Sequence, residues 1–427
     1  MATLLNYTIF YLLAFAPFIA FITTKYLNIS FYNMLSPFVW LAFFLQLITV
    51  TSVHKKKYII PKYALFLGLF VVYKMASDYF LVGKALNIKY IYTDYVLSGL
   101  LFMLIIENSL ISKKLISRLF KINIVILIIA FLVILYQQVI DDTFFVDLAK
   151  DNVANYILNP DIYEKRMPYI YSWLSLLEVS FSFISIAAII LSIRLKKHRK
   201  IYITFIWLAA IVIFAFLTKS RWIMINGLLL FLMYFLYHKV NFKSILKYFF
   251  IVIIFGYLGL NALEKINIPI KTILNDRILE KKNGGLEQGS AGTRLLAFFI
   301  FYKLFPEHPI LGKGYMHNFS GDSKDHELTN MLAGRSSQIH VGYLSLFYYY
   351  GIIGGGIFLL FLYHLMKKLK REAKQTRFWG AYFAYLGFIL ANLTLVTFTV
   401  FWVGLNMALL FHRYYVLQLK NKPKLSS

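Results

Sequence analysis

Apolar runs of about 20 residues recur along the whole chain, and they limit its possible folds more than any other feature. Helices of that length cross about 30 Å of hydrocarbon. In lipid every backbone polar group needs an internal partner, so only helices and closed barrels span a membrane. The runs lack the alternating polarity of barrel strands. Charged residues make up only 15% of the chain, against about one quarter in soluble proteins. The sequence therefore predicts an all-α, polytopic membrane helical bundle.

The apolar runs predict twelve transmembrane helices, although the last two share one long apolar stretch and eleven is the alternative. The predicted spans are 7–23, 31–52, 63–82, 91–106, 122–140, 169–193, 201–217, 221–237, 248–263, 340–366, 378–396 and 398–416.

Lys and Arg residues concentrate in every second connection between the predicted spans, which places those connections and both termini in the cytoplasm. Examples are Lys55–Lys57, the run Arg194 to Lys200, and Lys367 to Arg377. The net charge of +26 comes from these short clusters. Such clusters are typical of topology determinants and of contacts with anionic membrane lipids, so nucleic acid is not an expected partner.

The predicted organisation has three parts. Residues 1–263 hold the first nine spans, 264–339 form a large outer loop, and 340–427 hold three more spans and a basic cytoplasmic tail. A loop of that length inside a compact bundle is usually functional. Within it, Ile268–Lys282 and Thr293–Phe305 are predicted as short helices. Apolar residues cover most of the second helix, so it should lie in the membrane interface or pack on the bundle.

Three residues on the outer side could carry chemistry together. Arg221 stands at the outer end of the eighth span, Arg294 in the first turn of the second loop helix, and His340 where the loop meets the tenth span. The planar fork of Arg suits a phosphate, and a helix N-terminus favours an anion further. His takes a proton from a hydroxyl near neutral pH. The set indicates attack by a hydroxyl with an anionic phosphate as the leaving group. Arg335 belongs on the same side.

Each candidate also has an ordinary structural reading. Arg221 could be an interface anchor, Arg294 a solvated loop charge, and His340 an interfacial polar residue. Within the spans, Lys74 and Asp78 are four residues apart and should form an ion pair on one helix face. Two more acidic residues stand within or at the end of predicted spans. Glu178 is expected to make a hydrogen bond inside the bundle, and Asp94 is expected to face water.

The sequence lacks Cys, a Walker sequence, a glycine-rich dinucleotide turn and an HExxH motif. The outer surface has few Asp residues and offers no cage for a divalent metal on a diphosphate. We therefore expect no metal site and no cofactor, with arginines supplying the positive charge instead.

Three segments, in order along the chain, resemble motifs of the O-antigen polymerase and O-antigen ligase family. They are Thr218-Lys-Ser-Arg221, the stretch from Gly292 through Arg294 to Pro309-Ile-Leu-Gly312-Lys-Gly314, and the stretch from His340 to Tyr350-Gly-Ile-Ile-Gly354. Departures from the family pattern are Trp222 after the first Arg and Val341 and Gly342 after the His, mainly on the acceptor side.

The resemblance implies a metal-independent glycosyltransferase of the GT-C class that uses undecaprenyl-diphosphate-linked glycans at the outer face of a bacterial inner membrane. It implies that Arg221 and Arg294 hold the donor's diphosphate and that His340 activates the acceptor hydroxyl. Arg335 has only its nearness in sequence in its favour.

We expect a polymerase, which transfers the glycan onto another lipid-linked repeat unit. The alternatives are a ligase, which transfers it onto lipid A-core, and a glycolipid flippase, which would have short loops and polar residues along a central cavity. Flippase and chain-length regulator proteins are the candidate protein partners.

Overall fold

The computed structural model describes part of the chain in enough detail for its helices and contacts to be discussed. The described residues are 2–16, 19, 31–53, 55, 57–82, 91–140, 178–197, 227, 229–230, 261, 290–314, 339, 341–393 and 402–420.

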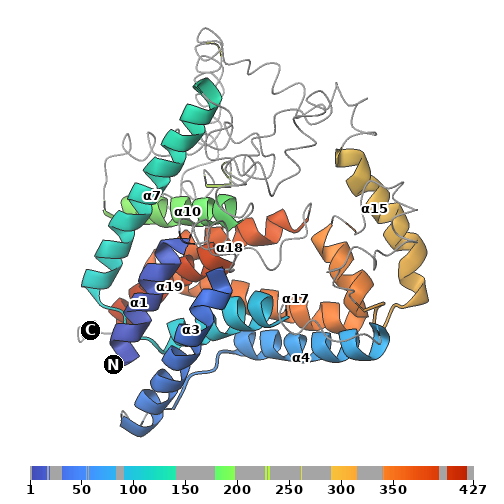
Figure 1. Cartoon of the computed structure of the whole chain (residues 1–427), viewed down its shortest axis with the longest axis horizontal. Coiled ribbons are helices and arrows are strands. Elements are labelled where there is room, and N and C mark those ends of the chain that lie inside the picture. Colours follow the sequence, from blue (N-terminus) through green and yellow to red (C-terminus); the bar gives the residue numbers. More distant parts are fainter. Residues whose placement is uncertain are drawn as a thin grey trace.

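Throughout these ranges the secondary structure is helical (Figure 1), with no strand among the described residues. The helices, in chain order, are α1 (Ala2–Ala14), α3 (Phe31–Ile48), the π-helix η1 (Thr49–Val53), α4 (Lys62–Val82), the π-helix η2 (Tyr92–Leu101), α6 (Phe102–Asn108), α7 (Lys113–Val139), α10 (Glu178–Lys197), α15 (Ser290–Leu304), the 3-10 turn η4 (Phe305–Glu307), α17 (Gly342–Thr376), α18 (Gly380–Ala391) and α19 (Trp402–Lys420).

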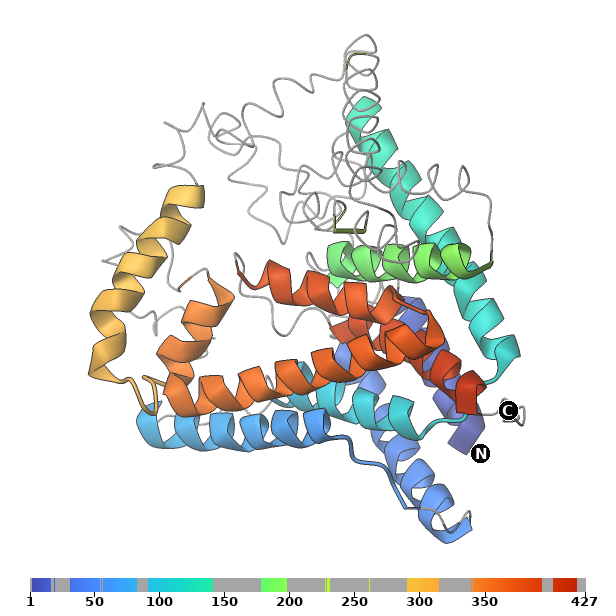
Figure 2. The same ribbon diagram turned by 180° about the vertical axis from the view of Figure 1, so that it is seen from behind.

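Helices α4 and α17 form an antiparallel pair that lies along one edge of the molecule (Figures 1 and 2). The ring of Phe66 stacks on His364 at 5.0 Å between centroids, and Phe70 packs on Phe358 at 4.7 Å. As the α4 residue number rises, the number of its α17 partner falls. The start of α4 therefore lies beside the end of α17, and the start of α17 lies beside the later turns of α4.

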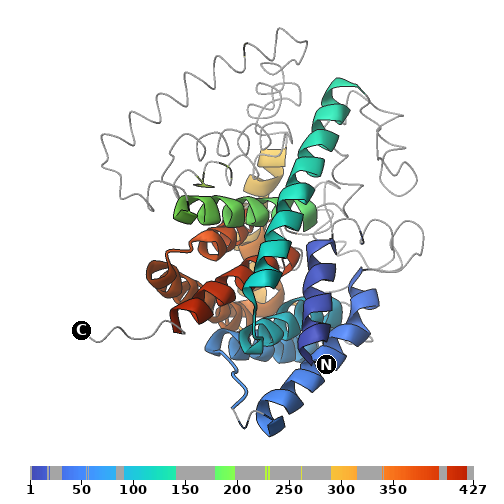
Figure 3. The same cartoon turned by 90° about the vertical axis from the view of Figure 1, so that its left-hand side faces the viewer.

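Helices η2, α15, α18 and α19 contact this pair, and the other described helices pack on these in turn. Helices α10, α18 and α19 contact one another, and α19 also contacts α6 and α17. Helices α1 and α3 pack together, and α3 reaches η2 (Figure 3). The core is continuous and contains many fully buried aromatic rings, among them Phe10, Phe102, Phe361 and Tyr385.

The described helices follow the order of the predicted spans along the chain, but their ends differ from the predicted ends. Span 63–82 matches α4 almost residue for residue, whereas α7 begins nine residues before its predicted span 122–140. The reason lies in Ser112, whose hydroxyl accepts a hydrogen bond from the Leu115 N–H at 3.2 Å and caps the helix. Basic residues placed in a loop, such as Lys113, are therefore helical. The same is true of Lys367–Thr376, which continue α17.

Other predicted elements have different outcomes. The predicted span 91–106 is one continuous helical run made of η2 and α6. Helices α18 and α19 are separate, as predicted. The predicted spans 201–217, 221–237 and 248–263, apart from single residues, and the loop helix 268–282 lie outside the described residues.

Three described helices are long and apolar enough to cross a membrane: Asn33–Val53, Lys62–Leu81 and Gly342–Thr376. Large apolar side chains such as Phe44, Leu69 and Val72 are more than half exposed on two of them. A surface of that kind suits lipid rather than water. These helices are those of a membrane protein.

Candidate functional site

Helix α17 is broken nine residues after it begins. Gly351 has φ 60° and ψ −168°, a backbone conformation that only glycine adopts readily. The break leaves carbonyl groups before Gly351 and N–H groups after it without partners in the helix. Unpaired backbone groups are costly away from water, so other groups must satisfy them.

The turn that follows α15 supplies these partners. The N–H groups of Lys313 and Gly314 donate to the carbonyls of Tyr348 and Tyr349 at 3.1 and 2.9 Å. In return, the Ile352 N–H donates to the carbonyl of Pro309 at 2.9 Å, and a fourth bond joins the next residue to the turn. We call these four backbone hydrogen bonds, between residues 309–314 and 348–353, the loop–helix lock.

Glycines are required where the turn and the break in α17 approach each other. Gly312 and Gly314 have φ angles of 80° and 76°. A Cβ on Gly312 would lie 2.4 Å from the Tyr349 carbonyl oxygen, and one on Gly351 would lie 2.2 Å from the Ile310 carbonyl oxygen. Both distances are far below van der Waals contact with backbone atoms. The lock therefore explains both glycines of the Pro-x-x-Gly-x-Gly segment and the first glycine of the Tyr-Gly-x-x-Gly segment, whereas a Cβ on Gly354 would meet the Tyr73 ring at 2.4 Å.

Side chains from α4 support the lock from below. The Tyr73 hydroxyl lies 2.9 Å from the Leu311 carbonyl oxygen and 3.1 Å from that of Tyr350, so it touches both partners of the lock. Lys74, 2% exposed, pairs with Asp78 at 2.9 Å and donates a hydrogen bond to the Tyr350 hydroxyl. The predicted Lys74–Asp78 ion pair is confirmed.

Asp94 was expected to face water, but the structure shows it half-buried in η2. The Thr93 hydroxyl donates a hydrogen bond to its carboxylate at 3.2 Å. The prediction was wrong because the span end at which Asp94 stands is covered by neighbouring helices, including α3 and α4.

Arg294 lies on α15, the helix that leads into the lock. The described part of this helix begins at Ser290, three residues before the predicted start. Arg294 is consequently the fifth residue and not in the first turn, and it is half-buried. Because helical side chains lean toward the N-terminus, a side chain in the second turn can still reach the end of the helix that favours anions.

Helix α15 packs on α17 by one face and leaves an apolar face uncovered (Figure 2). Ala297, Ile300 and Leu304 are buried, whereas Phe299 and Tyr302 are 73% and 84% exposed. The prediction named the membrane interface and packing on the bundle as alternatives. The structure shows the packing, and the exposed aromatic face is compatible with contact with lipid at the same time.

The other predicted site residues, Arg221, Arg335 and His340, lie outside the described residues, as does the Glu178 side chain. Both neighbours of His340 are described, and Ile339 and Val341 are 0% and 3% exposed. Sequence reasoning missed Tyr73 and Tyr350 because nothing in a run of aromatic residues marks the two that contact a distant turn.

Comparison with known proteins adds a family. Residues 203–359 match the family model described as O-antigen ligase. The matched range contains Arg221, Arg294 and His340 together with both partners of the lock. No curated protein matches the chain. The match confirms the resemblance found in the sequence: residues 203–359 carry a domain of the O-antigen ligase family.

Proposed function

We propose that the protein is a polymerase of bacterial surface polysaccharide. It transfers a glycan from undecaprenyl diphosphate onto the non-reducing end of another lipid-linked repeat unit. The acceptor hydroxyl forms a new bond to the anomeric carbon of the donor, the bond from that carbon to the diphosphate breaks, and undecaprenyl diphosphate leaves. The hydroxyl proton passes to a base.

The loop–helix lock is the observation that carries this proposal. It ties the turn after α15 to the break in α17. Helix α15 bears Arg294 near its start, and α17 begins two residues after His340. Catalysis between a bound phosphate and an activated hydroxyl requires the two groups to be held at a fixed separation. A rigid join between the two segments that bear them meets that requirement.

In this proposal Arg221 and Arg294 hold the donor's diphosphate and stabilise the charge that develops as it leaves. His340 takes the acceptor's proton. The burial of Ile339 and Val341 supports the choice of His340, because a base has to be held by the bundle. Arg335 is proposed as a further phosphate ligand on its nearness to His340 alone. The reaction needs no metal ion.

The proposal includes a place in the cell. The chain would lie in the inner membrane with twelve spans in a GT-C-like arrangement, both termini in the cytoplasm, and residues 264–339 outside. The alternation of basic connections supports this orientation. A flippase that delivers the lipid-linked units and a chain-length regulator are the proposed protein partners.

A ligase that transfers the same donor onto lipid A-core is the second candidate, favoured by the match of residues 203–359 to the O-antigen ligase family. Polymerase and ligase share the donor and differ in the acceptor. The departures at Val341 and Gly342 fall on the acceptor side. A flippase is a more remote candidate, since the polar candidate residues cluster at one outer loop instead of along a central path.

Gel analysis of surface polysaccharide from a strain lacking this protein tests the proposal. We expect the ladder of long chains to disappear while a single repeat unit remains on the core. Accumulation of lipid-linked polymer would instead identify a ligase. Unchanged polysaccharide would rule out both enzymes.

A further inference from the structure

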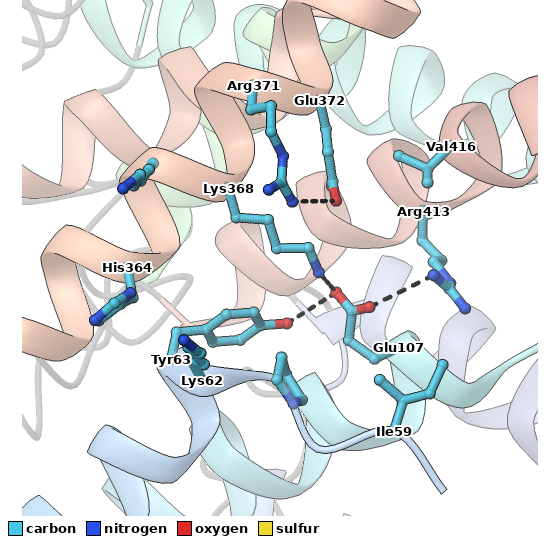
Figure 4. Close-up of a pocket in the computed structure, with 12 residues that line it drawn as sticks. Ile59, Lys62, Tyr63, Glu107, His364, Lys368, Arg371, Glu372, Arg413 and Val416 are labelled. Atoms are coloured by element: carbon cyan, nitrogen blue, oxygen red, sulfur yellow. Dashed lines mark hydrogen bonds and ion pairs between the residues drawn. The ribbon is translucent and has the colours of Figure 1, made fainter. Parts of the chain in front are cut away.

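A second polar site lies at the opposite end of the α4–α17 pair from the lock. A cavity of about 490 Å³ opens where the first turn of α4, the end of α6, the last turns of α17 and α19 meet (Figure 4). Its lining residues are Ile59, Pro61, Lys62, Tyr63, Glu107, His364, Lys367, Lys368, Arg371, Glu372, Arg413 and Val416. Tyr63 and Lys74 are eleven positions apart on α4, which separates the two sites by about 17 Å.

The lining carries more positive than negative charge. Five Lys and Arg side chains face the carboxylates of Glu107 and Glu372, which leaves three positive charges uncompensated with His364 neutral. A cavity with such an excess attracts anions, and Arg and Lys together suit a phosphate group.

The carboxylates at the base of the cavity are already engaged. Glu107 accepts hydrogen bonds from Lys368 and from the Tyr63 hydroxyl at 2.9 Å, and it lies 3.5 Å from Arg413 (Figure 4). Glu107 lies just beyond the predicted span 91–106. Burial raises the pKa of its carboxyl, but the charges of Lys368 and Arg413 outweigh burial and hold that pKa below its usual range. Glu107 therefore organises the base of the cavity and cannot neutralise its rim.

The cations at the rim remain available to a ligand. Lys62, Lys367 and Arg371 are exposed, and within the described part of the chain their only ion pair is a loose one from Arg371 to Glu372 at 3.8 Å. The buried Nε–H of Arg413 finds no hydrogen-bond acceptor within the described part of the chain. A buried donor without an acceptor is costly, and a bound anion would supply the hydrogen-bond acceptor that Arg413 lacks.

The apolar surface beside the cavity favours a lipid over a small ion as the ligand. Exposed apolar side chains lead away from the cavity along the same two helices: Leu65 and Leu69 on α4, and Leu360 and Tyr363 on α17. Acyl chains would lie against these residues while the headgroup enters the cavity. Basic pockets between membrane helices on the cytoplasmic side are known sites for anionic headgroups, and the predicted topology puts this end of α4 and α17 in the cytoplasm.

We propose that this cavity binds the phosphate of an anionic membrane lipid, with the headgroup between Lys62, Lys367, Arg371 and Arg413. The site is separate from the glycan-transfer site and does not depend on the reaction proposed above. Its ligand would fasten the ends of α4, α17 and α19 together.

The test uses the purified full-length protein in neutral detergent, where no charged membrane surface contributes. Its melting temperature is followed while phosphatidylglycerol, phosphatidylcholine or inorganic phosphate is added. The variant Lys367→Gln/Arg371→Gln removes two exposed rim cations. The matched control Lys370→Gln/Lys374→Gln removes two exposed cations from the same turns of α17 that do not line the cavity. Equal melting temperatures of the two variants without lipid show that both are folded.

We expect phosphatidylglycerol, but not phosphatidylcholine, to raise the melting temperature of the wild type and the control. In the rim variant the concentration needed should rise by roughly tenfold or more, because two charge-assisted contacts are lost. If inorganic phosphate alone produced the same variant-dependent rise, the lipid would be overturned as the source of the phosphate. No rise in the wild type, or equal rises in both variants, would overturn the site.

Discussion

Replacing Gly351 by Ala should break the loop–helix lock. The backbone at Gly351 lies in a region that costs other residues about 1–3 kcal/mol. The added Cβ would also meet the Ile310 carbonyl oxygen at 2.2 Å, so the turn must move away from α17. That movement removes the bonds from the Ile352 and Ile353 N–H groups, each worth about 0.5–1.5 kcal/mol. The total loss is about 2–6 kcal/mol.

Gly356 provides a control in the same helix. A Cβ there would have no atom within 4 Å, and Ala is favoured over Gly inside a helix by about 1 kcal/mol. Gly356→Ala should therefore leave the protein unchanged or slightly more stable. The two variants add the same methyl group five residues apart, so any difference between them reports on the lock.

The assay has two readouts. The melting temperature of each purified variant, followed by tryptophan fluorescence in detergent, measures stability, and the polysaccharide ladder of a complemented deletion strain measures function. We expect Gly351→Ala to melt well below wild type and to lose the ladder, and Gly356→Ala to keep both. If Gly351→Ala matched Gly356→Ala in both readouts, the lock would have no role in stability or in catalysis.

Four further predictions concern single groups. Arg294→Lys should lower transfer by about 10²–10³, since Lys lacks the bidentate fork, and near-normal polymer would exclude diphosphate binding there. His340→Gln should lower transfer by about 10²–10⁴ while protein and donor binding persist; a full-length ladder would remove His340 from the mechanism. Turnover by the purified enzyme should survive EDTA, and restoration by Mg²⁺ after loss would contradict this. Lys74→Met should destabilise by about 3–5 kcal/mol and Lys74→Met/Asp78→Leu by much less; equal melting temperatures would contradict a buried ion pair.

Hydrophobic runs predicted which segments are helical but not where the helices end. Hydropathy marks the part of a helix that lipid surrounds, and a helix continues into water as long as its backbone and caps allow. The basic residues Lys113 and Lys367 favour helix as much as Leu does, so α7 and α17 extend past the predicted spans. Ser112 was a local signal for the start of α7 that hydropathy does not weigh.

Local spacing predicted the pair Lys74–Asp78, because residues four apart on a helix are neighbours. The third member of that group, Tyr350, stands 276 residues from Lys74, and no local pattern connects them. Taken alone, the prolines and glycines of Pro309–Gly314 indicate a stop for the preceding helix. The second role of this segment, as a partner for the break in α17, depends on tertiary contacts and could not be read from the segment alone.

The loop–helix lock is made entirely of backbone groups, and this has a consequence for how the outer loop can change. The glycines and their φ angles fix the join, and the exposed side chains of Ile310 and Leu311 take no part in its hydrogen bonds. Everything between Gly314 and Ile339 starts and ends at points that the bundle fixes. In the proposed enzyme, the residues between Gly314 and Arg335 could therefore be replaced without moving the arginine on α15, so that the acceptor changes while the donor is held as before.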